Sequence, residues 1–388
     1  MTFIDKLYLI LMRKKYNKKN PVFRFGYDEQ LTYLNDFDVE EKNSDNIQRS
    51  YYQYLMQRKY SSKMEKFVVD IASFVSLILF RITLKVHEIN SKNKKDLDFI
   101  ITSQSILKFI PETFLIKKYS IPQESKKNKV ITKKDYVLIK KISKDYWNKP
   151  YFVLKVLRKI VEYSYYVNNY NIKSVVTSSE YSFTSSILTY YLNKYNVKHV
   201  NVMHGEKLIF IRDSFFTFDE MYIWDDFYKI IFIELKCKVN RYNLFLPNFF
   251  SYEDRTHTVT IDYTYYLSSE NIKQLKVIRD SLLPLKTNGF IVAVRPHPIY
   301  SNKKAVERIF KDFVLDIETD ISASINRTTC VVSLYSTVLF QSHFINKKVI
   351  IDNLSDINKF NTLLDLKYIM LNKEHTLLSD EIKSLVGE

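Results

Sequence analysis

Glycine is scarce in this sequence, with only four glycines among 388 residues. The glycine-rich phosphate-binding loops G-x-x-x-x-G-K-[ST] and G-x-G-x-x-G each need glycines at fixed, short spacings. Here the glycines stand far apart, at Gly26, Gly205, Gly289 and Gly387. Neither loop exists in this chain. Any phosphate site must therefore use helix N-termini, hydroxyl groups and cationic side chains.

Cysteine is scarcer still. Cys237 and Cys330 lie in apolar surroundings, without a C-x-x-C pair or a Cys/His spacing typical of zinc ligands. Two such residues cannot form a disulfide framework, and we expect buried free thiols in a reducing compartment. No metal site is predicted from these residues, although Asp225-Asp226 at the end of a predicted strand leaves a metal open.

Only one long hydrophobic run is present, at residues 67–86. It is long enough to span a bilayer. However, Asp70 and Arg81 would each cost about 2.5–3.5 kcal/mol near the centre of a membrane helix. The run therefore predicts a buried or interfacial helix. The chain starts Met-Thr-Phe-Ile-Asp-Lys, with an early acid and no small-residue cleavage site, so no cleavable signal peptide is predicted and a cytoplasmic location is expected.

Positive charge is in excess, with a formal net charge of +16. Such a charge suits nucleic acid, an anionic membrane or an anionic substrate. A basic nucleic-acid-binding protein is therefore the rival hypothesis. However, the lysines are dispersed rather than gathered in a stripe, so no nucleic-acid partner is expected. Residues 1–20 join apolar residues to a basic run at 13–19. This segment fits either a first helix with a solvated end or an element on an anionic membrane surface, which would make the protein peripheral on the inner face of the plasma membrane.

Strands and helices alternate from residue 150 onward. The pattern predicts helices at 151–168 and 183–195 and strands at 97–102, 172–177, 198–203 and 220–224. After a linker near residue 250, a second series follows, with strands at 257–262, 289–294, 313–316, 330–334, 347–351 and 367–371. This alternation predicts an α/β protein with two doubly wound, Rossmann-like domains facing across a cleft. We expect residues 1–250, with extra N-terminal helices, to form the acceptor-side domain and residues 251–388 to bind the donor.

The motif Arg295-Pro296-His297-Pro298 ends the apolar strand 289–294. The two prolines stop the strand, because each lacks an N–H and fixes φ. In open α/β sheets, ligands bind at this carboxyl edge. Arg295 offers a planar fork for phosphate, and His297 offers a hydrogen bond or a proton near neutral pH. The alternative is an ordinary strand-to-loop turn with two surface polar residues.

A second motif, His204-Gly205-Glu206, follows the strand 198–203. Gly205 would let the backbone turn sharply and approach a ligand closely. His204 fits a general base for an acceptor hydroxyl or a phosphate donor, and also a histidine that simply packs at a strand end. Glu180 ends the neighbouring strand, where it could be a base, a contact to the acceptor sugar, or an acid at a helix start.

A third motif, Ser333-Leu334-Tyr335-Ser336-Thr337, lies where a strand gives way to a helix. Hydroxyls together with the free N–H groups of a helix start form an anion site that needs no glycine. The alternative is plain helix capping by Ser or Thr.

Together these motifs resemble those of bacterial GT-B transferases of surface-polysaccharide assembly. The shared pattern is a strand before His-Gly, then Arg/Lys-x-His-Pro, then a Ser/Thr pair before a helix, then a Lys-x-Val-Ile strand. Here these are His204-Gly205, residues 295–298, Ser336-Thr337 and residues 347–350. Such groups include sialyl- and polysialyltransferases with an HP motif, Kdo transferases of capsule export, and teichoic-acid glycerophosphotransferases. The resemblance covers residues 170 to 355.

The resemblance implies roles for individual residues. His297, followed by Pro298, inherits contact with the phosphate of a cytidine nucleotide donor, and Ser336 and Thr337 inherit donor-phosphate binding. His204 inherits the role of catalytic base from the glycerophosphotransferases. The sialyltransferases instead carry an acidic pair before glycine, where this chain has Met-His-Gly, so the base remains open among His204, Glu206 and Glu180.

The function expected from these roles is transfer of a sugar from a nucleotide-activated donor to an oligosaccharide or lipid-linked glycan acceptor. The donor implied first is a CMP-sugar such as CMP-sialic acid, and the alternative is a CDP-glycerol or CDP-alditol phosphotransferase. As the anomeric bond breaks, charge develops on the CMP phosphate, and Arg295, His297 and the hydroxyls of Ser333, Ser336 and Thr337 would stabilise it. No cofactor or metal is expected, because side chains suffice to neutralise one phosphate.

Overall fold

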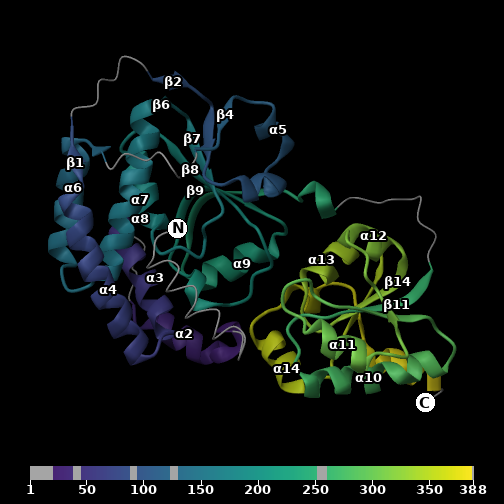
Figure 1. Ribbon diagram of the computed structural model, residues 1–388. Helices are drawn as coiled ribbons and strands as arrows, with labels where there is room; N and C mark the ends of the chain where they lie inside the picture. The colour runs from purple at the N-terminus through teal and green to yellow at the C-terminus, as the bar shows by residue number, and fades with distance from the viewer. Residues whose placement is uncertain (1–20, 38–44, 88–93, 123–129, 251–259, 387–388) are drawn as a thin grey trace. The chain divides into compact units, whose positions relative to one another are not determined.

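The computed structural model describes residues 21–37, 45–87, 94–122, 130–250 and 260–386 (Figure 1). The basic segment 1–20, predicted as a membrane-surface element, lies outside these residues. The chain divides into two compact units. The first contains the described residues up to His204 and Ile209–Phe245, and the second contains Gly205–Leu208 and the chain from Leu246 onward. Each unit is built on its own six-stranded parallel sheet.

The sheet of the first unit has the strand order β10-β9-β8-β7-β3-β4. Its strands are β3 (Phe99–Ile101), β4 (Tyr119–Ser120), β7 (Ser174–Thr177), β8 (Lys198–Val202), β9 (Thr217–Ile223) and β10 (Lys238–Leu244). The chain winds outward in both directions from β3 and β7, so the strand order reverses between these two strands. In open parallel sheets, the crevice at such a reversal point is the common ligand site.

Helices of the first unit cover this sheet and pack on one another. They are α2 (Tyr27–Asn35), α3 (Asn46–Lys59), α4 (Lys63–Ile82), α5 (Glu112–Leu115), α6 (Lys133–Asp145), α7 (Pro150–Asn169), α8 (Ser185–Asn193) and α9 (Phe227–Glu234). Short 3-10 turns of this unit lie at Pro21–Arg24, Gln104–Phe109 and Ile211–Asp213, and a further one, Asn248–Phe250, falls in the second unit. Two small parallel pairs are also present: β1 (Lys85–Val86) with β5 (Val130–Ile131), and β2 (Lys95–Asp96) with β6 (Tyr170–Asn171).

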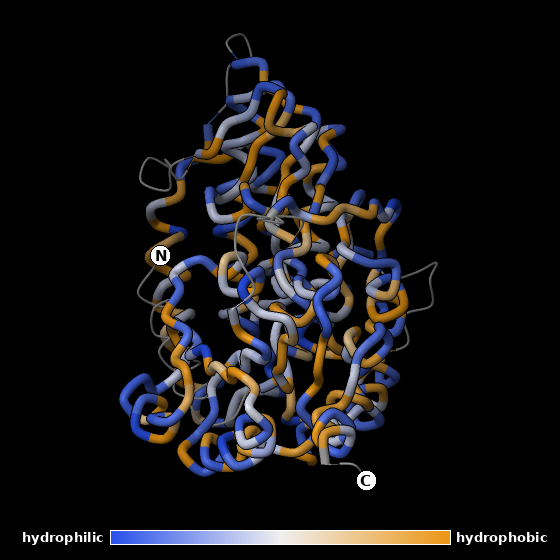
Figure 2. Tube along the Cα trace, turned by 90° about the vertical axis from the view of Figure 1, so that its right-hand side faces the viewer, coloured by the Kyte–Doolittle hydropathy of each residue, from blue (hydrophilic) through white to orange (hydrophobic). Residues whose placement is uncertain are grey.

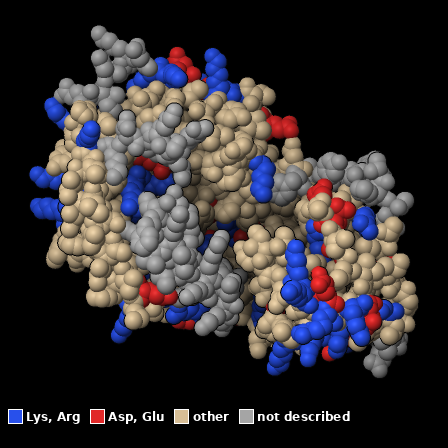
Figure 3. Space-filling view, in the orientation of Figure 1, with Lys and Arg blue, Asp and Glu red and all other residues tan. Residues whose placement is uncertain are grey.

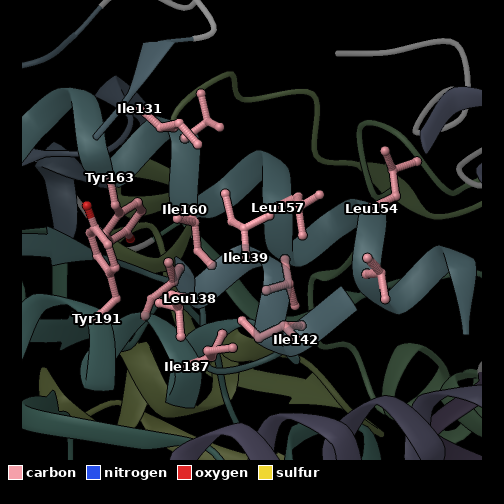
Figure 4. Close-up of a cluster of buried hydrophobic side chains, with 14 of the residues drawn as sticks. Ile131, Leu138, Ile139, Ile142, Leu154, Leu157, Ile160, Tyr163, Ile187 and Tyr191 are labelled. Carbon is pink, nitrogen blue, oxygen red and sulfur yellow. The ribbon is translucent and has the colours of Figure 1, made fainter. Parts of the chain in front are cut away.

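The central helix of this unit is α7, which begins at Pro150 in the first helical turn, where a missing N–H costs nothing. Figure 4 shows Leu154, Leu157 and Ile160 of α7 within a cluster of buried apolar side chains. Helix α6 begins with a capping box in which Thr132 and Asp135 exchange hydrogen bonds, and it adds Leu138, Ile139 and Ile142 to the same cluster. This core packs on one face of the sheet. Ile106 and Ile110 pack on the opposite face.

The sheet of the second unit has the order β13-β12-β11-β14-β15-β16. Its strands are β11 (Ile261–Tyr266), β12 (Val292–Arg295), β13 (Val314–Leu315), β14 (Thr328–Ser333), β15 (Lys348–Ile351) and β16 (Thr376–Leu377). In chain order this is 3-2-1-4-5-6, the Rossmann arrangement, with its reversal point between β11 and β14.

Helices lie on both faces of the second sheet, with α10 and α11 on one side and α12 and α13 on the other (Figure 1). The helices are α10 (Ile272–Thr287), α11 (Lys303–Ile309), α12 (Ile321–Asn326), α13 (Thr337–Phe344), α14 (Ile357–Asp365) and α15 (Leu378–Val386), and a 3-10 turn spans Ile369–Asn372. The prediction of two doubly wound, Rossmann-like α/β domains is therefore confirmed for each unit.

One predicted strand is wrong. Residues 367–371 were expected to form a strand, but Ile369–Asn372 form the 3-10 turn, and the last strand is β16. Tyr368, Ile369 and Met370 are fully buried there. A short buried apolar run has the same composition in a strand and in a turn, so periodicity does not separate the two.

The hydrophobic run at 67–86 forms most of α4 and continues into β1. Among the helices in the described ranges, none combines the length and the apolar composition that a membrane-spanning segment needs. Figure 2 shows hydrophobic and hydrophilic residues interspersed along most of the traced chain. Cys237 and Cys330 are free thiols, as predicted.

Candidate active site

The carboxyl ends of β7 and β8 bring His204 and Glu180 together. Strand pairing sets Thr177 opposite Asn201, so the residues that follow each strand emerge at the same level. Nδ1 of His204 lies 3.0 Å from Oε1 of Glu180 and 2.7 Å from the hydroxyl of Ser178. This pair sits beside the point between β3 and β7 where the strand order reverses.

Glu180 is fixed in place by its surroundings. Its side chain has no exposed surface. The amide of Asn201 donates to Oε2 over 3.1 Å, and the amide of Gln53 donates to the backbone carbonyl of Glu180 over 2.8 Å. Asn201 in turn accepts a hydrogen bond from the backbone N–H of Ser179, at 2.8 Å. A buried carboxylate held by such donors can orient a neighbouring imidazole without moving.

His204, by contrast, keeps about a third of its side chain exposed, at 36%. The rings of Tyr181 and Phe109 approach it edge to face, with centroids 5.5 and 6.3 Å away. Nδ1 faces both the Glu180 carboxylate and the Ser178 hydroxyl, and when Nδ1 carries the ring proton, Nε2 is the nitrogen left to accept a proton from a bound hydroxyl. A carboxylate–histidine pair of this kind is the arrangement of a general base.

Gly205 and Glu206, which complete the second motif, have different surroundings from His204. Glu206 groups with the second unit, where Tyr368 is its hydrogen-bond partner and its Oε1 is buried. Burial raises the pKa of Glu206 well above its usual value, against the smaller lowering effect of Tyr368. Gly205 does not have a positive φ, and a Cβ added there would meet no atom within 4 Å, so its backbone does not require glycine.

The motif after β12 fixes the state of the His297 ring. Two backbone N–H groups, those of Ile299 and Tyr300, donate to Nδ1 over 3.1 and 3.2 Å. Nδ1 is therefore an acceptor, and the ring proton must be on Nε2. Burial also lowers the pKa of His297, which favours the neutral ring. His297 is thus set as a neutral N–H donor at the carboxyl edge of the second sheet, while Pro298 is exposed beside it.

Arg295 is committed to an ion pair. Its guanidinium lies 3.2 Å from Asp316, and both side chains are largely buried, with 11% and 3% exposed. Asp316 also accepts hydrogen bonds from the hydroxyl of Ser324 and the backbone N–H of Glu318. The charge predicted to meet a phosphate is therefore shared with a carboxylate inside the protein.

In the third motif, Ser333 has a structural role, whereas Ser336 and Thr337 lie where a ligand could bind. Ser333 is buried, and its hydroxyl donates to the backbone carbonyl of Tyr266 over 2.9 Å, joining the ends of β14 and β11. Ser336 is the N-cap of α13 and accepts from the N–H of Val338. Thr337, the first residue of α13, is exposed. Ser336 and Thr337 thus lie at the start of a helix next to the reversal point, where the helix dipole favours an anion.

Four residues that line these edges were not predicted. Ser178 and Asn201 support the His204–Glu180 pair. In the second unit, burial lowers the pKa of Lys359, on α14, while the nearby carboxylate of Glu270, after β11, raises it. The polar positions of Asn201 and Ser178 at strand ends were a usable signal for the first two. Lys359 and Glu270 come together only through folding, and their spacing in the sequence does not predict that they are close.

In the described ranges, no three His, Cys, Asp or Glu side chains converge in a way that could hold a metal ion. Asp225 accepts from the backbone N–H of Phe227 at the start of α9, and Asp226 pairs with Lys229. These contacts make the Asp225-Asp226 pair part of a helix start.

No protein-family model and no curated protein sequence matches this chain. Solved structures do show similarity. The wall teichoic acid polymerase TagF, in its H548A form, is 12% identical over 87% of both chains, with a TM-score of 0.42. The UDP-GlcNAc 2-epimerase of Methanocaldococcus jannaschii, in complex with UDP-GlcNAc and UDP, is 10% identical over 72% of this chain and 93% of its own, with a TM-score of 0.41. A UDP-glucose:anthocyanidin 3-O-glucosyltransferase with UDP gives 11% identity over 61% and 72%, with a TM-score of 0.37. At these values the similarities identify no activity for this chain.

Proposed function

We propose that this protein is a glycosyltransferase of bacterial surface-polysaccharide assembly that uses a nucleotide-activated donor, with a CMP-sugar as the first candidate. The observation that carries the proposal is the His204–Glu180 pair at 3.0 Å, at the carboxyl edge of a doubly wound sheet. A second Rossmann-like sheet carries the neutral donor His297 and the start of α13 at its own carboxyl edge. Transfer from a nucleotide donor to a hydroxyl needs a base and donors for the phosphate; the first sheet carries the candidate base, and the second carries the candidate donors.

In the proposed reaction, the first unit binds the acceptor. Nε2 of His204 takes the proton of the acceptor hydroxyl, and the oxygen forms a new bond to the anomeric carbon of the donor. The imidazolium that results is stabilised by the buried carboxylate of Glu180, which Asn201 holds in place. Such a positioned base contributes about 10²–10⁴-fold to rate.

The second unit binds the donor. The bond from the anomeric carbon to the phosphate oxygen breaks, and its electron pair stays on the phosphate of the departing CMP. The Nε2–H of His297 and the N–H and hydroxyl groups at Ser336 and Thr337 are donors for that charge. These donors are uncharged, and Arg295 is paired with Asp316, so the edge suits a phosphate with a single negative charge, such as the phosphodiester of a CMP-sugar. We propose that no metal is required, which retention of activity in excess EDTA would test.

The second candidate is a CDP-glycerol or CDP-alditol phosphotransferase. The observation that favours it is the same histidine base, because the sequence resemblance assigns a His-Gly base to the glycerophosphotransferases and an acidic base to the sialyltransferases. The acceptor hydroxyl would then attack the phosphorus bearing the alditol, and CMP would again leave. For either reaction we propose a cytoplasmic site that acts on oligosaccharide or lipid-linked acceptors.

Nucleic-acid binding is the rival from another class. It needs a concentrated stripe of one charge sign. Figure 3 shows acidic atoms among the Lys and Arg atoms of the second unit on the face in view. On this face of the second unit the charges are therefore mixed and form no stripe of one sign.

The first test is thermal stabilisation of the purified chain by CMP, CDP, UDP, GDP and ADP. A ligand at 100 times its dissociation constant stabilises a fold by about 2.7 kcal/mol. We expect selective stabilisation by CMP or CDP that disappears in His297→Ala and persists in His375→Ala, whose ring contacts the backbone carbonyl of Lys373. Release of CMP from CMP-N-acetylneuraminic acid or from CDP-glycerol then separates the two candidates. Stabilisation by UDP or GDP alone would overturn the cytidine donor.

A further inference from the structure

Helix α4 (Lys63–Ile82) presents an apolar face outward as well as inward. Its inner face buries Val69, Ser73, Leu77 and Phe80 in the first unit. Nine large apolar side chains on the same helix are 41–79% exposed: Met64, Phe67, Val68, Ile71, Phe74, Val75, Ile78, Leu79 and Ile82. A helix that is apolar on all sides is normally covered on all sides. We therefore expect the outward face of α4 to be covered by a binding partner.

This outward face is continuous and carries no charge. Its members recur at three- and four-residue spacings from Met64 to Ile82, which places them along one side of the helix. Twenty residues of helix extend about 30 Å. Scattered single apolar residues are normal on protein surfaces, but a contiguous patch of this extent marks an interaction site.

Cationic side chains flank the face. Lys63 and Arg81 are exposed and lie 18 residues apart, or five helical turns, so they border the same side of α4. The one acid of the helix interior, Asp70, is turned to Arg58 in an ion pair. Lys63 and Arg81 therefore make one border of the apolar face positive, while the other acid of the helix, Glu65, lies toward the opposite border and is held in the capping box with Ser62.

The flank continues onto α6. Strand β1, directly after α4, pairs with β5, directly before α6, so the end of α4 lies next to the start of α6. Helix α6 exposes five cations, Lys133, Lys134, Lys140, Lys141 and Lys144, and one acid, Asp145. It also exposes Val137, and Trp147 follows it with 76% of its surface exposed. In Figure 3 the part of the first unit over α4 is mainly uncharged, with Lys and Arg atoms at the edge near α6.

We propose that the outward face of α4 docks on an anionic lipid surface. Apolar side chains inserted at the headgroup level, cations facing acidic headgroups, and an exposed tryptophan are the features of interfacial binding. A second copy of this chain would bring two positive borders together, and the net charge of +16 would oppose that contact. The charge therefore favours the lipid surface over a self-interface. The inference is independent of the proposed transferase activity.

The test is co-sedimentation of the full chain with vesicles of phosphatidylcholine containing phosphatidylglycerol, compared with phosphatidylcholine alone. We expect binding to the anionic vesicles that weakens as salt is raised. The triple variant Phe67→Gln, Ile71→Gln, Phe74→Gln should lower the partition coefficient at least about tenfold, since losing one buried aromatic side chain already changes it by that order. A matched control replaces three other exposed isoleucines, Ile116, Ile233 and Ile317, by Gln and should bind as the wild type does.

A second measurement does not depend on the triple variant folding. Ile71→Trp places a fluorophore in the centre of the face, and brominated phosphatidylglycerol should quench it strongly while leaving Ile317→Trp unquenched. Absence of wild-type binding to anionic vesicles, or equal binding by the triple variant, would overturn the proposal. A wild-type dimer in light scattering that becomes a monomer in the triple variant would assign the face to a second copy and would also overturn it.

Discussion

Oε1 of Glu180 lies 3.0 Å from Nδ1 of His204, although the two residues follow different strands. Parallel pairing of β7 with β8 sets the level at which each residue leaves the sheet. The carboxylate is fully buried and the imidazole is partly exposed, so the contact joins a fixed orienting group to a ring that solvent or substrate can reach.

Replacing the carboxylate should therefore affect catalysis more than binding. In Glu180→Gln, Nδ1 loses its anionic partner, and we expect kcat of the transferase reaction to fall by about 10²–10⁴-fold. Stabilisation by CMP should be unchanged, because the donor edge belongs to the second sheet. Glu220→Gln, on β9 of the same sheet and paired with Lys198, serves as the control and should keep its activity. A wild-type kcat in Glu180→Gln would remove the pair from the mechanism.

Ser336 has two roles that can be separated. As the N-cap of α13 it accepts from the N–H of Val338, so Ser336→Ala should lower the free energy of unfolding by about 0.5–2 kcal/mol. If the start of α13 also binds the donor phosphate, the dissociation constant for CMP should rise in the same variant. Ser62→Ala removes the corresponding cap of α4 and should lower stability without changing CMP binding. Denaturant unfolding and calorimetric titration measure the two quantities, and equal CMP affinity in both variants would leave Ser336 a cap alone.

Arg295 should behave as part of the structure. Arg295→Gln leaves Asp316 buried without its counter-ion, which costs up to about 3–5 kcal/mol of unfolding free energy. The donors from Ser324 and Glu318 that remain on Asp316 reduce this loss. The double variant Arg295→Met, Asp316→Leu should regain much of the stability, because it removes both buried charges. If Arg295→Gln keeps the wild-type melting temperature and loses all nucleotide stabilisation, the guanidinium is a phosphate ligand instead.

His199 should make stability depend on pH. It is fully buried beside Thr189 and Tyr163, and burial lowers its pKa to about 3. The unfolded chain, with a histidine pKa near 6.5, binds one more proton between these two values, so the free energy of unfolding falls as pH drops from about 6.5 toward 3. His199→Gln should flatten this slope in urea unfolding at several pH values, whereas the exposed His87→Gln should leave it unchanged. The same slope in both variants would assign the effect to other groups.

The alternation of strands and helices after residue 150 was sufficient to predict two parallel sheets. Strand β10 was missed because its sequence, Lys-Val-Asn-Arg-Tyr-Asn-Leu, is polar and largely exposed at a sheet edge, where no apolar pattern is needed. The strand expected at 367–371 is a buried 3-10 turn, since apolar burial alone does not specify extended backbone. The start of the strand expected at 257–262 falls partly outside the described residues, and β11 begins at Ile261.

For the candidate site too, the sequence predicts some features and not others. Strand ends reveal which polar residues reach the carboxyl edge, and His204, Glu180 and His297 were found in that way. What they touch depends on sheet register and on distant helices. Gln53, for example, reaches the backbone of Glu180 from α3, 127 residues away in the chain. Likewise, the backbone N–H groups that set the tautomer of His297 became visible only once the turn had a geometry.

The position of β11 at the centre of its sheet has a consequence for synthesis on the ribosome. Ile261 pairs with Thr328 of β14, a residue that is made 67 positions later. At 5–20 residues per second, one side of β11 lacks its neighbour for roughly 3–13 s after translation of the strand. During that interval a tyrosine-rich strand edge is open to pairing with another chain. Faster elongation through residues 267–328, or a chaperone bound to the nascent chain, would shorten or shield this exposure and raise the yield of folded protein.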